Sequence, residues 1–137
     1  MSLFNIFDVS GSALQAQSVR LNTTSSNLAN ANSISSSTGE TYRARHPVFA
    51  PLMKDFGEES PSVGVKVMGV VESQSPLRRE HKPEHPLADE EGFIYLPNVN
   101  VVEEMANMIS ASRAYQTNVE VMNSAKQMLM RTLAIGQ

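Results

Sequence analysis

The composition of the last part of the chain is the strongest constraint on the fold. Residues 101 to 135 contain neither glycine nor proline, the two residues that interrupt helices, and Gly136 follows directly. Asn100, with Glu103 three positions later, resembles a capping box and predicts that a helix begins at residue 101. An unbroken helix of this length would extend about 50 Å, more than a chain of 137 residues can cover with its own side chains. We therefore expect contacts with neighbouring molecules.

The expected C-terminal helix carries large apolar side chains at every seventh position. This spacing places them along one line of a helix and is typical of helices that pack lengthwise against one another. The line and its apolar neighbours are Val101, Met108, Tyr115, Met122 and Leu129, with Met105, Val119 and Leu133 beside them. Glu104 falls outside this line, and its replacement by glutamine is expected to change little.

Residues 5 to 32 predict a second helix with a narrower apolar line. The line consists of Phe7, Leu14, Leu21 and Leu28. A coiled coil needs a second apolar line three residues further along. In this segment that second line is mostly polar and consists of Ser10, Gln17, Thr24 and Ala31. A segment so rich in serine, threonine and asparagine should be largely unfolded until it packs against a partner. The simplest partner is the C-terminal helix, which would bring the two apolar lines together.

The middle of the chain has a different composition. All seven prolines lie between residues 40 and 97. The segments 41–49, 63–71 and 92–97 have the apolar patterns of short strands, and the polar stretch 33–39 predicts a flexible connector. The sequence therefore predicts an α+β chain in which the long terminal helices form a coiled-coil-like pair. Its parts are an N-terminal helix over 1–35, a linker with a small β-rich module over 36–98, and a C-terminal helix over 99–137.

Composition and motifs argue against several functions. The formal net charge of −3 leaves no basic surplus for nucleic acid. The chain has no cysteine, no apolar run of membrane-spanning length and no recognisable cleavable signal at its start. It also lacks the glycine-rich phosphate loops and nucleophile motifs of common enzymes. We expect no cofactor, no bound metal, no small-molecule substrate and no catalytic residue.

Two other functions remain open from the residues alone. The first is a metal-dependent enzyme. His81 and His85 lie four residues apart and close to Asp89, a spacing that could hold zinc on a helix, although Pro83 and Pro86 prevent a regular helix here. The methionine-rich face of the C-terminal helix would suit a cytoplasmic helical adaptor. Zinc analysis of the purified protein tests the first alternative, and cell fractionation tests the second.

Both ends of the chain also resemble a known family. The stretch "SNLANANS" at 26–33 resembles the N-terminal signature of the rod and hook proteins of the bacterial flagellum. The stretch "MISASRAYQTNVEVMNSAKQMLMRTLAIG" at 108–136 is similar to their C-terminal signature. The central "HPLADEEGFIYLPNVNVVEEM" at 85–105 resembles the joint of the proximal-rod members more than that of distal-rod or hook members, which remain the alternative.

This resemblance implies a structural subunit whose terminal helices polymerise into the wall of a tubular drive shaft, which transmits torque and encloses an export channel. The implied partners are other copies, other rod proteins and the flagellar type III export apparatus, with contact to the membrane-ring base left open. The implied location is the basal-body rod in the periplasmic space, reached without a cleavable signal. The resemblance adds four residues to the two apolar lines as assembly contacts, Asn27, Asn30, Arg113 and Asn118, and it also includes Tyr115 of the C-terminal line.

Residues 83 to 100 are predicted to form a joint that fixes the direction of the C-terminal helix. The prolines restrain the approach, a glycine turn reverses the chain, an aromatic pair anchors it, and a cap starts the helix. These residues are Pro83, Pro86, Gly92, Phe93, Tyr95, Pro97 and Asn100.

Overall fold

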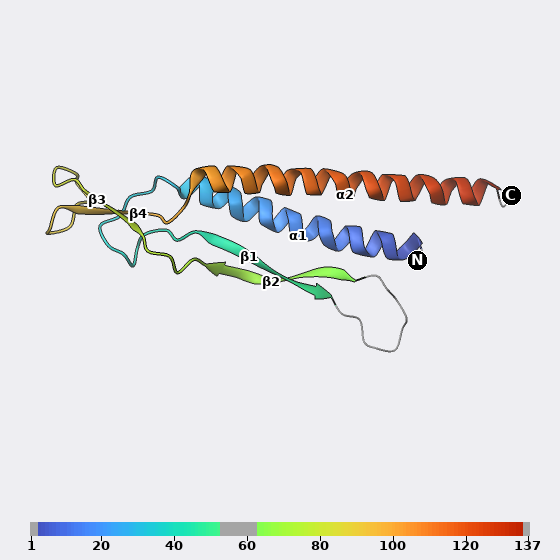
Figure 1. Ribbon diagram of the computed structural model, residues 1–137, viewed down its shortest axis with the longest axis horizontal. Coiled ribbons are helices and arrows are strands. Elements are labelled where there is room, and N and C mark those ends of the chain that lie inside the picture. Colours follow the sequence, from blue (N-terminus) through green and yellow to red (C-terminus); the bar gives the residue numbers. More distant parts are fainter. Residues whose placement is uncertain (1–2, 53–62, 136–137) are drawn as a thin grey trace.

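The computed structural model describes residues 3–52 and 63–135, and it confirms the predicted α+β fold (Figure 1). The elements in chain order are α1 (Leu3–Asn30), β1 (Arg45–Leu52), β2 (Gly64–Glu72), β3 (Arg78–His81), β4 (Phe93–Leu96) and α2 (Val101–Ile135). Gly136, predicted to end the second helix, lies outside the described residues.

The two helices pack side by side in antiparallel directions, as Figure 1 shows. α1 lies in the middle of the molecule, with α2 along one side and the β1–β2 hairpin along the other. α2 is the longer helix and projects beyond the start of α1. Over the residues described, neither helix has the long apolar stretch that a membrane crossing requires. The predicted pairing of the terminal helices is therefore confirmed, and it leaves one end of α2 uncovered.

The buried residues of both helices are small or polar. Ala111 and Ala125 of α2 are almost fully buried, and so are Thr24 and Ala31, which belong to the polar line of α1. Small side chains allow two helix axes to approach closely. The large residues of the α1 apolar line are only half-buried. The expectation that the two apolar lines meet at the centre of the helix contact is therefore wrong.

The β-rich middle consists of two separate two-stranded antiparallel sheets. β1 and β2 pair from Arg45 opposite Glu72 to Leu52 opposite Gly64, with an irregularity that leaves Met68 without an opposite residue. β3 and β4 form the second sheet at the far end of the molecule, beyond the start of α2 (Figure 1). The strands at β1, β2 and β4 lie within or next to the predicted segments. β3 has no apolar pattern and was not predicted.

The connector between α1 and β1 is outside helices and strands, as expected, but it carries specific hydrogen bonds. The backbone of Ser35 exchanges two hydrogen bonds with that of Tyr95, so the connector adds a bridge to the free side of β4. A small apolar cluster of Ala31, Ala44 and Val99 lies beneath it. This cluster brings together the end of α1, the start of β1 and the start of α2.

Candidate assembly surface

Asn27 is the centre of a buried polar network that joins α1, α2 and β1. Its side chain is fully buried and uses its whole hydrogen-bonding capacity. The amide nitrogen donates to the Arg45 carbonyl (2.8 Å) and to Glu104 Oε2 (2.9 Å). The amide oxygen accepts from the Arg45 amide (2.9 Å) and from the Tyr42 hydroxyl (2.8 Å). Asn27 therefore acts within the subunit, where it fixes three elements relative to one another.

Glu104 is the acidic member of this network. Only 4% of its surface is exposed, and it lies on the face of α2 toward α1. Because a buried carboxylate that loses its hydrogen-bond donor is costly, its contact with Asn27 matters for stability. Glu104 falls outside the apolar line, as the sequence indicates, yet it lies in the contact between α1 and α2. A second polar contact, from Arg20 Nη2 to Asn107 Oδ1 (2.9 Å), crosses the helix pair one turn away.

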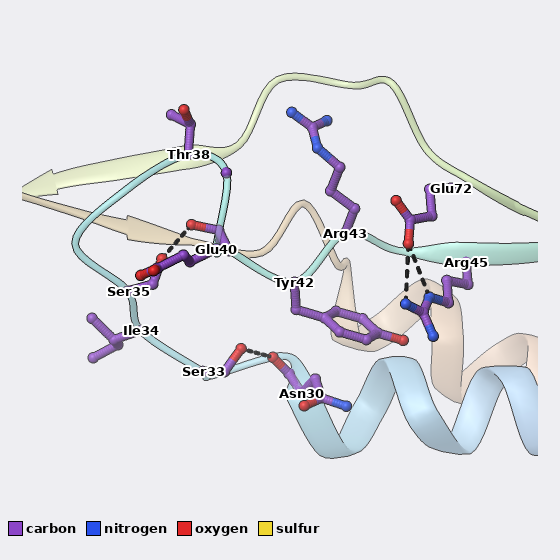
Figure 2. Close-up of a pocket in the computed structure, with 12 residues that line it drawn as sticks. Asn30, Ser33, Ile34, Ser35, Thr38, Glu40, Tyr42, Arg43, Arg45 and Glu72 are labelled. Carbon is purple, nitrogen blue, oxygen red and sulfur yellow. Dashed lines mark hydrogen bonds and ion pairs between the residues drawn. The ribbon is translucent and has the colours of Figure 1, made fainter.

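A polar cleft opens beside the network, between the end of α1 and the connector (Figure 2). It has a volume of about 740 Å³. Tyr42 and Arg45 line it, with the Arg45 guanidinium over the Tyr42 ring at 5.5 Å and paired with Glu72 at 3.0 Å. Burial raises the pKa of the Tyr42 hydroxyl above its ordinary value of 10.0, so at neutral pH this group keeps the proton that it donates to Asn27.

The two predicted apolar lines lie together along one side of the helix pair. On α1, each large residue precedes a residue of the polar line by three positions, as Leu21 precedes Thr24. On α2, the buried residues Glu104, Ala111 and Ala125 are each followed by a large apolar residue four positions later, as Tyr115 follows Ala111. At 100° per residue, both offsets rotate the line by about 40–60° in the same sense. Because the helices are antiparallel, equal rotations bring both lines to the same side of the contact.

We name this surface the apolar strip. It consists of Phe7, Leu14, Leu21 and Leu28 of α1 with Val101, Met108, Tyr115, Met122 and Leu129 of α2. The hairpin meets α1 on a different side, where Ser12 Oγ accepts a hydrogen bond from the Val65 amide (3.1 Å). Over the described residues, no other element of the subunit covers the strip.

The remaining predicted contact residues differ in exposure. Half-buried are Asn30, Asn118 and Val119, and exposed are Met105, Arg113 and Leu133. Asn30 Nδ2 and Asn118 Nδ2 donate to carbonyls of their own helices, those of Ser26 and Ala114. Their role in contacts with other molecules stays a prediction, as does that of the strip.

The predicted joint forms the β3–β4 turn and the start of α2. Gly92 has φ of 79°, and a Cβ there would lie 3.1 Å from that of Pro83, so both the backbone and the space favour glycine. Asn100 Oδ1 accepts a hydrogen bond from the Val102 amide (3.2 Å) and caps α2 as the sequence predicts. Pro97 is fully buried just before this cap, whereas Pro83 and Pro86 are exposed.

Phe93 and Tyr95, the aromatic pair of the joint, each contact a residue on the exposed side of β4. Phe93 packs edge-on against His81, and Tyr95 donates from its hydroxyl to Asp89 Oδ2 (3.2 Å). The residues of β4 that point inward are Ile94 and Leu96, which the sequence reasoning did not single out. Their alternation with the aromatic residues is the period-two signal that could have identified them.

The histidines of this region have neighbours that account for them without a metal. His85 Nδ1 accepts a hydrogen bond from the Leu87 amide (3.1 Å), and Asp89 Oδ1 accepts from the amides of Glu91 and Phe93. Across residues 3–52 and 63–135, no three histidine, aspartate or glutamate side chains lie close enough together to hold a metal ion. The geometry gives no support to the zinc alternative.

Two family models match the chain, one at each end. Residues 7–33 match the family described as "Flagella basal body rod protein", and residues 90–135 match "Flagellar basal body rod FlgEFG protein C-terminal". These ranges include most of α1, all of β4 and all of α2. The helix pair and the joint therefore define a protein of the flagellar rod class.

Full-length relatives narrow this class. The flagellar basal-body rod protein FlgC of Salmonella typhimurium strain LT2 is 50% identical over 137 residues, which cover both chains completely. FlgC of Escherichia coli O6:H1 is also 50% identical, and FlgC of Yersinia enterocolitica is 48% identical, again over the full length of both chains. This chain belongs to the FlgC family of flagellar basal-body rod proteins. The resemblance to the flagellar rod proteins is thereby confirmed, and the distal-rod or hook alternative is not favoured.

Proposed function

We propose that this chain is a structural subunit of the flagellar rod and that it polymerises with copies of itself and with other rod proteins through the apolar strip. The observation that carries the proposal is the strip itself. Large apolar side chains run along the helix pair and remain half-buried or exposed, while small residues fill the contact between the helices. Aligned apolar surface of this kind marks a site of association.

The subunit reaches the rod through the flagellar type III export apparatus, as an unfolded chain without a cleavable signal, and it has no catalytic role. Two features of the chain support this part of the proposal. It contains no cysteine, so it cannot form wrong disulfides in an oxidising compartment. Its two long helices depend on each other and on buried polar contacts, so an unpaired helix has little to hold it folded.

Substitutions on the strip test the proposal. Leu21→Asp or Met122→Asp puts a carboxylate into an apolar contact that repeats in every subunit, at a cost of several kcal/mol, roughly 3 to 5, for each unpaired buried charge. Cells with either variant should be non-motile, should still secrete the subunit, and should build no rod beyond it. Secretion is followed by immunoblotting of the periplasmic and culture fractions, and rods by electron microscopy of basal bodies.

Matched controls lie one residue away on each helix. Asn22→Asp and Asn123→Asp introduce the same charge at exposed positions off the strip, and cells carrying them should swim normally. Normal rods in Leu21→Asp cells would refute the strip as the assembly surface. A tagged wild-type chain that stays in the cytosol would refute export and would favour the helical adaptor instead.

A further inference from the structure

The β1–β2 hairpin has apolar side chains that α1 does not cover. Partly or mostly exposed side chains occur on both strands: Val48, Phe49, Leu52, Val65, Met68, Val70 and Val71. An isolated two-stranded hairpin is marginally stable in water at best. α1 packs against one side of this hairpin, and none of the other described elements packs against the rest. The hairpin therefore has an apolar surface that needs a second partner.

The free edges of the hairpin do not favour a partner strand. Along β1, the backbone groups of every second residue point away from β2; these residues are Arg45, Pro47, Phe49 and Pro51. The backbone of Arg45 bonds to Asn27 instead of β2, and the two prolines have no N–H group to donate. Three of these four positions thus have no free N–H group, which blocks strand addition. The edge of β2 is interrupted at Met68. The partner must therefore pack through side chains against the surface of the hairpin.

α2 carries an apolar stripe of matching character on the side away from α1. Val102 and Ile109 each lie two residues before a buried position of α2, Glu104 and Ala111, which is a rotation of about 200° around the helix. Met105 lies between them in sequence and about 40–60° around the helix from them, toward the apolar strip. Val102 is 76% exposed and Met105 is 52% exposed. We name Val102, Met105 and Ile109 the outer stripe.

The hairpin and the outer stripe lie on opposite sides of the molecule, separated by the helix pair (Figure 1). They cannot meet within one subunit. Two different complementary surfaces on opposite sides of one chain are what a head-to-tail contact between copies requires. From this arrangement we propose that the β1–β2 hairpin of one copy packs across the outer stripe of α2 in a neighbouring copy.

This contact rests on the proposed polymerisation but uses a different surface from the apolar strip. It is small. Three residues on the α2 side cannot supply the roughly 800 Å² per partner of an ordinary stable interface. The contact therefore forms in the assembled rod, where the strip already holds the subunits together, and not between free subunits. The purified subunit in dilute solution should accordingly be monomeric.

Cysteine pairs test the proposal directly, because the natural chain contains no cysteine. Cells produce two copies with different tags, one carrying Met68→Cys in the hairpin and the other Met105→Cys in the outer stripe. After mild oxidation of purified basal bodies, a large share of the two tagged chains should migrate as one disulfide-linked dimer. The same two proteins mixed as free subunits should not link.

The control pair replaces Met105→Cys by Met128→Cys, a methionine of equal exposure (50%) on another side of α2. It should link at least tenfold less. Equal linking of both pairs, linking only between two Met68→Cys copies, or capture of a different rod protein would each refute the contact. If Met68→Cys disturbs assembly, Val70→Cys with Ile109→Cys repeats the test. Rods that contain the chain but show no linking refute only this contact, whereas rods that lack the wild-type chain refute the proposed function.

Discussion

At the end of the helix pair where α1 finishes and α2 begins, Asn27 and Glu104 are buried and bonded to each other, whereas at the opposite end Met128, Met130 and Leu133 are exposed. The first end, which we call the polar end, also holds the joint, the connector and the start of β1. The second, the projecting end, has only α2 beyond the start of α1 (Figure 1).

This difference indicates how a subunit can be both defined in shape and incomplete. Hydrogen bonds depend on direction, so the polar end fixes how α1, α2 and the hairpin meet within one chain. Apolar contact depends little on direction, so the exposed side chains of the projecting end do not by themselves fix the position of a partner. The polar end determines the shape of the subunit, while exposed apolar residues at the projecting end remain available for association.

Replacing Asn27, at the polar end, should cause the largest loss of stability. Asn27→Leu removes four hydrogen bonds and leaves the Glu104 carboxylate buried without its donor, so we expect a loss of about 3 to 5 kcal/mol in the free energy of unfolding. Urea unfolding followed by circular dichroism measures it. Asn22→Leu, on the exposed side of the same helix, should change the midpoint little. An unchanged midpoint for Asn27→Leu would mean that the polar end does not hold the pair together.

Substitutions of Glu104 should have an intermediate effect that depends on the replacement. Glu104→Ala removes the acceptor of the Asn27 amide and should cost about 1 to 3 kcal/mol, whereas Glu104→Gln keeps an acceptor oxygen and should cost about 1 kcal/mol or less. The same unfolding measurement compares the two. If both variants behave alike, the carboxylate contributes through its charge and not through its hydrogen bond.

The smallest expected effect is a loss of local stability at acidic pH, limited to the polar end. The Phe93 amide, together with the Tyr95 hydroxyl, holds the pKa of Asp89 below its ordinary value of 3.8. Because the pKa of Asp89 is lower in the folded chain than in the unfolded chain, the ionised carboxylate stabilises the fold at pH values above 3.8. This stabilisation decreases below pH 3.8 and is lost as the pH falls through the pKa of the folded chain. The protection of the Gly92 and Phe93 amides, measured relative to the intrinsic exchange rate at each pH, should therefore decrease below about pH 4, and Asp89→Asn should abolish this step. Exchange near Met128 should show no such step.

The sequence predicted the parts of this structure that depend on local pattern. The absence of glycine and proline after Asn100 predicted the start of α2 and its unbroken course to Ile135, and alternating valines predicted β2. The centre of the helix contact could not be predicted from large apolar residues, because small ones fill it. A search for lines of small residues would have found Ala111 and Ala125 on the same line as Glu104.

Other features depend on contacts between distant parts of the chain. β3 consists of charged and polar residues and is a strand because β4 pairs with it, so no pattern of its own indicates it. Asn27 lies in a recognisable signature, but nothing near it in sequence identifies Glu104 as its partner. The apolar strip combines both kinds of evidence: the sequence indicates its two apolar lines, their place beside the helix contact required the structure, and their role in assembly stays a prediction.

The hydrogen bond between Asn27 and Glu104 joins residues that are 77 positions apart in the chain. Contacts of such long range form late, because the intervening chain must first be brought together. A chain that leaves a narrow channel one end first cannot make this contact until its other end has also emerged. If the subunit is exported through a channel as proposed above, this bond forms only after Asn27 and Glu104 have both emerged, and a copy that stalls before that point would lack it.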